Sequence, residues 1–89
     1  MLEIVPKSKF KKDFKKLKSS GKSLQELHNV IDLLQKGKQL DPTYHDHELK
    51  GNWRGYRECH IQSDWLLIYQ QTSTLLILVR TGSHSELFE

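Results

Sequence analysis

The apolar positions in the first half of the chain follow the spacing of amphipathic helices. Phe10, Phe14 and Leu17 recur at i, i+4 and i+7, and lysines occupy most positions between them. This pattern predicts a first helix that begins near Ser8, which can serve as its N-cap, and that ends at Gly21.

A second apolar stripe predicts a second helix, which begins at Ser23 and ends at Gly37. The stripe consists of Leu24, Leu27, Val30, Ile31, Leu33 and Leu34. Ser23 and Glu26 have the spacing of a capping box, in which each side chain binds the backbone N–H of the other residue. Because few residues connect the two helices, we expect an antiparallel helical hairpin.

From Tyr56 onward the apolar residues recur every second position, which is the spacing of β-strands. Residues 56–61 alternate in character, residues 65–69 are apolar on both faces, and residues 75–80 form a third apolar run. Short polar turns separate these runs, so we expect an antiparallel meander with residues 65–69 at its centre. With a short edge strand at residues 2–5, the pattern predicts an α+β fold, a small sheet with two helices packed on one face.

The composition limits the chain to one small core. It has 89 residues, of which 36% are hydrophobic, and a single cysteine, Cys59, so no internal disulfide can form. No apolar run approaches the length of a membrane span, and the N-terminus lacks the features of a secretion signal. We therefore expect one domain over residues 1–89, located in the cytoplasm.

Positive charge is concentrated near the N-terminus. Residues 1–22 contain eight lysines and two acidic residues, whereas residues 23–89 contain six basic and nine acidic residues. A lysine-rich segment can bind phosphates independently of sequence. The candidates on the first helix are Lys11, Lys12, Lys15 and Lys16. The alternative is a solvated helix face without a ligand, which the lysine pattern taken alone favours.

Most of the residues suited to chemistry lie in the second half of the chain. Four of the five histidines lie between residues 45 and 84, whereas His28 lies off the apolar stripe of the second helix and is excluded from the site. Imidazoles exchange protons near neutral pH, so this density predicts a site for proton transfer or for a metal ion. Metal is the weaker prediction, because the chain has no HExxH and no CxxC motif.

The strand ends carry the groups that are needed to cleave RNA. Arg80 can bind a phosphate, His84 can protonate a leaving oxygen, and Phe88 can stack on a base. RNA supplies its own 2′-hydroxyl nucleophile, so such a site needs no metal. His60 and Asp64 flank a turn and could join them. In the alternative interpretation, Asp64 only forms the turn and Phe88 only anchors the C-terminus in the core.

Two further side chains have positions compatible with the same site. His47 lies in a loop, where ligand-binding and catalytic residues are common. Glu58 shares a strand face with His60, so it is either a substrate contact or a structural hydrogen-bond partner of that histidine.

Three segments of the chain resemble the YafQ-type toxins of the RelE/ParE superfamily. They are residues 46–57, 60–69 and 80–88, with the patterns D-H-x-L-x-G-x-W-x-G-Y-R, H-x-x-x-D-W-L-L-I-Y and R-x-G-x-H-x-x-L-F. The resemblance implies a bacterial type II toxin that enters the ribosomal A site and cuts messenger RNA there. It also implies a DinJ-type antitoxin as partner, contact with DNA only through that antitoxin, and no cofactor.

The resemblance also implies functional roles at individual positions. The catalytic set would be His47, His60, Asp64 and His84, and the substrate-binding set Arg80 and Phe88. To the substrate-binding set we add Glu58, on the strand-face argument given above. We expect His84 to be the general acid, and Asp64 or His47 the base. Two other classes of function stay open, a gyrase inhibitor that cleaves nothing, as in the ParE branch, and an RNA-binding module without activity. The many proton donors and acceptors argue against the first, because binding alone does not require them.

Overall fold

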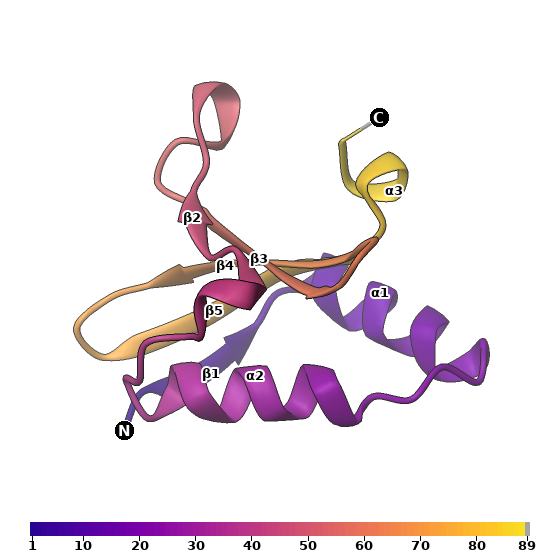
Figure 1. Cartoon of the computed structure of the whole chain (residues 1–89), viewed down its shortest axis with the longest axis horizontal. Helices are drawn as coiled ribbons and strands as arrows, with labels where there is room; N and C mark the ends of the chain where they lie inside the picture. Colours follow the sequence, from indigo (N-terminus) through magenta and orange to yellow (C-terminus); the bar gives the residue numbers. More distant parts are fainter. Residues whose placement is uncertain (89) are drawn as a thin grey trace.

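A computed structural model, which describes residues 1–88, has a five-stranded sheet at its centre (Figure 1). The strands are β1 (Glu3–Pro6), β2 (His47–Glu48), β3 (Arg57–Gln62), β4 (Trp65–Gln71) and β5 (Leu75–Gly82). Their spatial order is β1-β5-β4-β3-β2. Strands β2 to β5 form an antiparallel meander, and β1 pairs in parallel with β5 at the edge. The predicted meander, with residues 65–69 in its central strand, is confirmed.

Two helices, α1 (Ser8–Ser19) and α2 (Gln25–Gln35), lie on one side of the sheet (Figure 1). The buried residues between helices and sheet are Phe10, Leu27, Val30, Leu34, Leu40, Cys59, Ile61, Trp65, Leu67, Tyr69, Leu76 and Leu78. The two predicted helical stripes therefore do face the core. Within residues 1–88, no helix is long and apolar enough to cross a bilayer.

Both helices start differently from the prediction. Lys7 is the N-cap of α1 and makes no side-chain cap bond, so Ser8 is the first helical residue rather than the cap. In α2 the N-cap position is taken by Leu24, which packs against the core. Ser23 therefore lies one residue too early for the capping box with Glu26, and that prediction is wrong.

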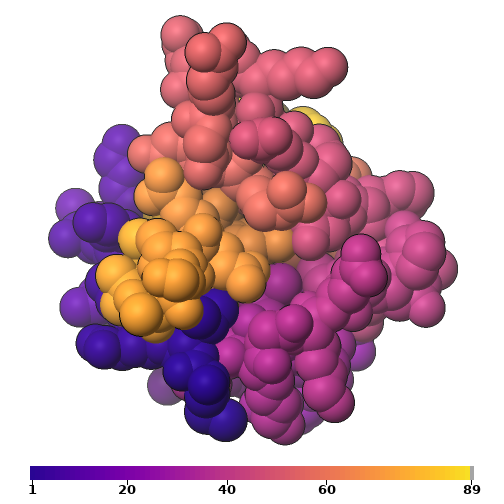
Figure 2. Space-filling view, turned by 90° about the vertical axis from the view of Figure 1, so that its left-hand side faces the viewer, coloured from indigo at the N-terminus to yellow at the C-terminus, as the bar shows by residue number. Residues whose placement is uncertain are grey.

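The structure has three short elements that the sequence pattern did not predict. The 3₁₀ helix η1 (Pro42–Tyr44) lies on the helix side (Figure 1), where Tyr44 packs against the core. The 3₁₀ helix η2 (Gly51–Trp53) and the five-residue helix α3 (His84–Phe88) lie on the opposite side of the sheet. Figure 1 shows the η2 segment and α3 projecting away from α1 and α2, and Figure 2 shows the η2 segment standing clear of the rest of the surface. Elements of one or two turns are too short to produce a periodic signal.

Candidate active site

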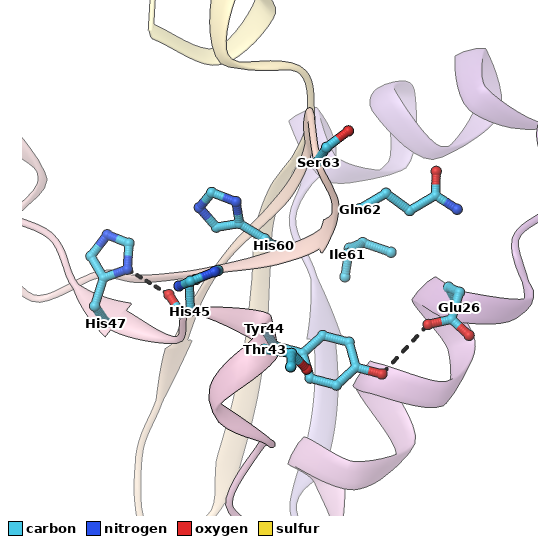
Figure 3. A pocket seen from close by; sticks show the side chains of 9 residues that line it. All are labelled: Glu26, Thr43, Tyr44, His45, His47, His60, Ile61, Gln62 and Ser63. Carbon is cyan, nitrogen blue, oxygen red and sulfur yellow. Dashed lines mark hydrogen bonds between the residues drawn. The ribbon is translucent and has the colours of Figure 1, made fainter.

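Asp46 holds the segment between η1 and β2 against the sheet. Its carboxylate accepts hydrogen bonds from the Tyr69 hydroxyl, at 2.8 and 2.9 Å, and from Arg57 Nε, at 3.2 Å. Tyr69 is buried, and burial together with the bond to Asp46 raises the pKa of its phenol, which stays a donor. Because Asp46 points inward, its neighbours His45 and His47 are presented to an open groove of about 770 Å³ (Figure 3).

His45 belongs to the site, although the sequence prediction left it out. Its backbone is left-handed (φ 49°), a conformation that residues other than glycine adopt rarely. Its carbonyl oxygen lies 2.6 Å from His47 Nδ1, and its ring centroid lies 5.4 Å from that of His60. The available signal was the His-Asp-His sequence, in which an inward aspartate leaves two histidines on the same side.

Glu58 is the buried acid of the site. The register of β2 and β3 puts it directly opposite His47, whose Nε2 lies 3.0 Å from Glu58 Oε2. Its other oxygen, Oε1, lies 3.8 Å from His84 Nε2 and accepts no hydrogen bond within residues 1–88. The side chain is only 5% exposed. Glu58 is therefore better placed to orient the two histidines than to meet a large substrate, and its predicted substrate contact stays untested.

Both ring nitrogens of His47 face oxygen acceptors. Nδ1 faces the His45 carbonyl and Nε2 faces the Glu58 carboxylate. A neutral imidazole has only one N–H, so both contacts are hydrogen bonds only when the ring carries two protons or when Glu58 carries one. His47 therefore connects the backbone of His45 with the buried carboxylate of Glu58.

His84 is positioned by the start of α3, where a capping box forms. Ser83 Oγ accepts a hydrogen bond from the Glu86 backbone N–H at 3.3 Å, and Glu86 Oε1 accepts one from the Ser83 N–H at 2.9 Å. Glycine suits position 82, because its φ is 155° and a Cβ would lie 3.0 Å from that carboxylate oxygen. The His84 backbone N–H donates to Asp64 Oδ1 at 3.3 Å, and its ring Nδ1 lies 4.0 Å from the same atom.

Helix α1 is joined to α3 by an ion pair between Lys16 and Glu86, with 2.8 Å between Nζ and Oε2. The hydrogen bond from Lys16, with a further one from the Ser83 N–H, lowers the pKa of Glu86 to about 2. Of the four lysines predicted to bind phosphate, Lys16 is therefore engaged within the molecule. The other three, Lys11, Lys12 and Lys15, are exposed.

Arg80 points toward α1 and forms a two-point ion pair with Asp13. Nε lies 2.7 Å from Oδ2 and Nη2 lies 3.0 Å from Oδ1, and the pKa of Arg80 is raised by this hydrogen bonding. Its guanidinium would have to leave Asp13 to bind a phosphate. The predicted phosphate contact of Arg80 stays a prediction, and Arg80 is not among the residues that line the groove.

Imidazole and aromatic rings form a continuous row across this side of the sheet. In spatial order the rings belong to His45, His60, His84, Phe88, Trp53 and Tyr56. Neighbouring ring centroids lie 5.3 to 6.1 Å apart. One end of the row opens into the groove, where Figure 3 shows His45, His47 and His60 around the same space. The other end is the aromatic η2 segment.

The four residues that were predicted to be catalytic lie near one another, although their roles stay predictions. His60 and His84 belong to the row, and His47 and Asp64 lie beside it. The ring of His60 lies 6.5 Å from that of His47 and 6.1 Å from that of His84, which in turn neighbours Asp64. Within residues 1–88, no three His, Cys, Asp or Glu side chains are placed to hold one metal ion. The arrangement can donate, accept and relay protons beside a solvent-filled groove.

Known proteins are similar to this chain in both sequence and fold. Residues 2–89 match the family described as bacterial toxin of type II toxin–antitoxin system, YafQ. The chain is 38% identical over 87 residues to the mRNA interferase toxin YafQ of Escherichia coli K12, covering 97% of this chain and 95% of that protein. A copper-bound mutant toxin from Helicobacter pylori has a TM-score of 0.95 at 49% identity, covering 99% of this chain and 100% of the other. The toxin–antitoxin complex DinJ–YafQ of E. coli has a TM-score of 0.92 at 37% identity, with 99% and 98% covered.

Proposed function

The chain belongs to the YafQ family of bacterial type II toxins, and on that basis we propose that it is an endoribonuclease that cleaves messenger RNA. The observation that carries the proposal is the buried Glu58 carboxylate between His47 and His84. Two imidazoles that share one buried acid can exchange protons with a substrate, which RNA cleavage requires and which a purely binding protein does not need.

The reaction requires a base, an acid and stabilisation of negative charge. The 2′-oxygen gives up its proton and attacks the adjacent phosphorus, and the bond from phosphorus to the 5′-oxygen breaks as that oxygen gains a proton. We assign the second proton to His84, because its side chain is 58% exposed while its Nε2 faces Glu58. The first proton is accepted by His47 or by Asp64, which is 71% exposed beside His84.

Positive charge at the phosphate is assigned mainly to imidazolium groups. His60 lies in the middle of the row of rings, with His45, His47 and His84 around it. Arg80 adds to this charge only when it exchanges Asp13 for the phosphate.

The proposed reaction needs no metal, because RNA supplies the nucleophile and the histidines supply the proton transfers. The H. pylori relative was crystallised with copper, so this part of the proposal requires its own test. Cleavage should persist when copper and zinc are removed by a chelator that leaves the Mg²⁺ needed by ribosomes. Loss of cleavage, restored by adding copper back, would contradict metal independence.

We further propose the ribosomal A site as the place of action and a DinJ-type antitoxin as the partner. The E. coli relative forms a complex with DinJ, and this chain aligns with nearly all of that toxin. The exposed Lys11, Lys12 and Lys15 supply contacts for ribosomal RNA phosphates.

The deciding experiment is primer extension on a translated reporter mRNA after the toxin is induced. The wild type should give cuts that align with codons and require translation, and His84→Ala should abolish them. His28→Ala is the matched control, since this exposed histidine on α2 lies outside the site. Growth arrest with intact mRNA would contradict the proposal and favour a gyrase inhibitor or an RNA-binding module.

A further inference from the structure

We propose that Trp53, together with Phe88, forms a stacking site for an unpaired RNA base that neighbours the scissile nucleotide. This inference rests on the proposed ribonuclease function and adds a specific binding residue to it. Trp53 comes from η2 and Phe88 from α3, two segments that are separated by most of the sheet in sequence.

Figure 1 shows the backbones of η2 and α3 as separate projections on the same side of the sheet. The two segments meet there through their side chains. The Trp53 and Phe88 rings meet edge to face, with their centroids 5.6 Å apart and the ring planes at 76°. The backbone N–H of Leu49 bonds the Tyr56 carbonyl at 2.9 Å, which closes the loop that carries Trp53. The rings of Trp53 and Phe88, which we call the platform, are therefore carried by two anchored elements.

The two tryptophans of the chain are used in opposite ways. Trp65 is 1% exposed in the helix-side core, and its Nε1–H donates to Thr81 Oγ1 at 2.9 Å. Trp53 is only partly buried, and Phe88 is 39% exposed. Aromatic rings that stay open to solvent beside a row of imidazoles are suited to bind the face of a nucleobase.

In the row of rings, the platform lies next to the proposed catalytic acid. The Phe88 centroid lies 5.6 Å from that of His84, and His84 is the proposed acid. Because the two ring planes are 76° apart, a base that stacks on the face of one ring meets the other ring with its edge. A base held in this way brings its own phosphate next to His84, while the strand continues over His60 into the groove. Stacking of this kind accepts any base, so the platform holds the strand and leaves codon choice to other contacts.

Trp53 also packs over the small cluster formed by Leu66, Ile68 and Leu87, so a purely structural role is the alternative. Two substitutions separate the roles. Trp53→Phe keeps an aromatic face and Trp53→Leu keeps apolar bulk without one. If Trp53 only covers the cluster, melting temperature and activity should change in parallel in both variants.

The test measures single-turnover cleavage of mRNA on programmed ribosomes as a function of toxin concentration. We expect Trp53→Leu to raise the half-saturating concentration about 5- to 100-fold, the range found for loss of a stacking residue, with little change in the limiting rate. Trp53→Phe should stay within about threefold of the wild type. Thermal melting of both variants provides the structural control.

Fluorescence gives an independent measurement of stacking. An RNA oligonucleotide with a 2′-deoxy nucleotide at the cleavage position cannot be cut, and it should quench wild-type emission but not the emission of Trp53→Phe. Wild-type half-saturation in Trp53→Leu, or equal quenching in Trp53→Phe, would overturn the inference while leaving the ribonuclease proposal intact. Absence of cleavage by the wild type would instead overturn the proposed function itself.

Discussion

The two faces of the sheet are built from the same strands but differ in composition and in burial. Among the described residues, 1–88, twelve buried residues form one core toward α1 and α2. On the other face the buried cluster of this part of the chain consists of Leu66, Ile68 and Leu87, and histidines and aromatic rings lie around it. In β3, Cys59 and Ile61 belong to the core, whereas Glu58 and His60 face the open side.

The difference shows how a chain of this size can carry both a core and a site. Because side chains alternate along a strand, β3 supplies core residues at odd positions and Glu58 and His60 at even ones. Stability is thereby concentrated on one face, and solvent can reach polar groups on the other. Changes on the helix side should mainly alter the free energy of unfolding, and changes on the open side should mainly alter catalysis.

The largest effect is expected from Leu67→Ala on the helix side. Leu67 is fully buried in the core, so its truncation should lower the free energy of unfolding by about 2–5 kcal/mol. Urea denaturation followed by circular dichroism measures this change. The activity per folded molecule should stay near the wild-type value, and a loss of less than about 1 kcal/mol would contradict the assignment of this face as the core.

Glu58→Gln is the complementary change on the open side. It keeps the shape of the side chain but removes the charge that faces His47 and His84, so the cleavage rate should fall about 10- to 100-fold. Stability should change little, because the buried oxygen Oε1 accepts no hydrogen bond from any residue between 1 and 88. The pH dependence of the single-turnover rate should also shift. An unchanged rate and pH profile would remove Glu58 from the positioning role.

A smaller effect is expected from the exposed lysines of α1. Changing Lys11 and Lys12 to glutamine should weaken ribosome binding and reduce the slope of log affinity against log salt by about 2, with no change in the limiting cleavage rate. The matched control is Lys36→Gln with Lys38→Gln, at the end of α2. Equal slopes for both pairs would show that α1 makes no specific phosphate contacts.

The smallest effect is expected from Glu86→Gln, which keeps the cap and removes the charge that binds Lys16. The pKa of Glu86 is lowered from 4.5 to about 2, so its contribution is complete above pH 4.5 and is lost as the pH falls through about 2. The carboxylate is 43% exposed, which limits the loss to about 1 kcal/mol or less. The melting temperatures of the wild type and of Glu86→Gln should differ at neutral pH, and the difference should disappear as the pH approaches 2. A constant difference across this range would contradict the assignment.

Two identical patterns show what could be predicted from the sequence and what could not. Ser23 and Glu26 have the S-x-x-E spacing of a capping box but form none, because the core draws Leu24 into the N-cap position. Ser83 and Glu86 have the same spacing and form the box. The local pattern is the same in both places, and tertiary contacts decide the outcome.

The prediction succeeded where one element decides the outcome. Periodicity of two placed Glu58 and His60 on one face of β3, and the apolar run of β4 indicated its central position. The partner of Arg80 could not be predicted, because Asp13 is 67 residues away in sequence. His45 was missed for a similar reason, since the contacts of Asp46 that present it lie on distant strands.

The parallel pairing of β1 with β5 has a consequence for how the molecule is made. Glu3 pairs with Leu75 and Pro6 with Leu78, so β1 cannot pair until β5 has been synthesised. Such distant pairing slows folding, because a long stretch of chain has to be ordered before the contact forms. The ion pairs of α1 also form late, because their partners Arg80 and Glu86 lie in β5 and α3. A nascent chain in which β5 and α3 have not yet left the ribosome therefore lacks the complete sheet and the α3 anchor, and the site can form only after both have been synthesised.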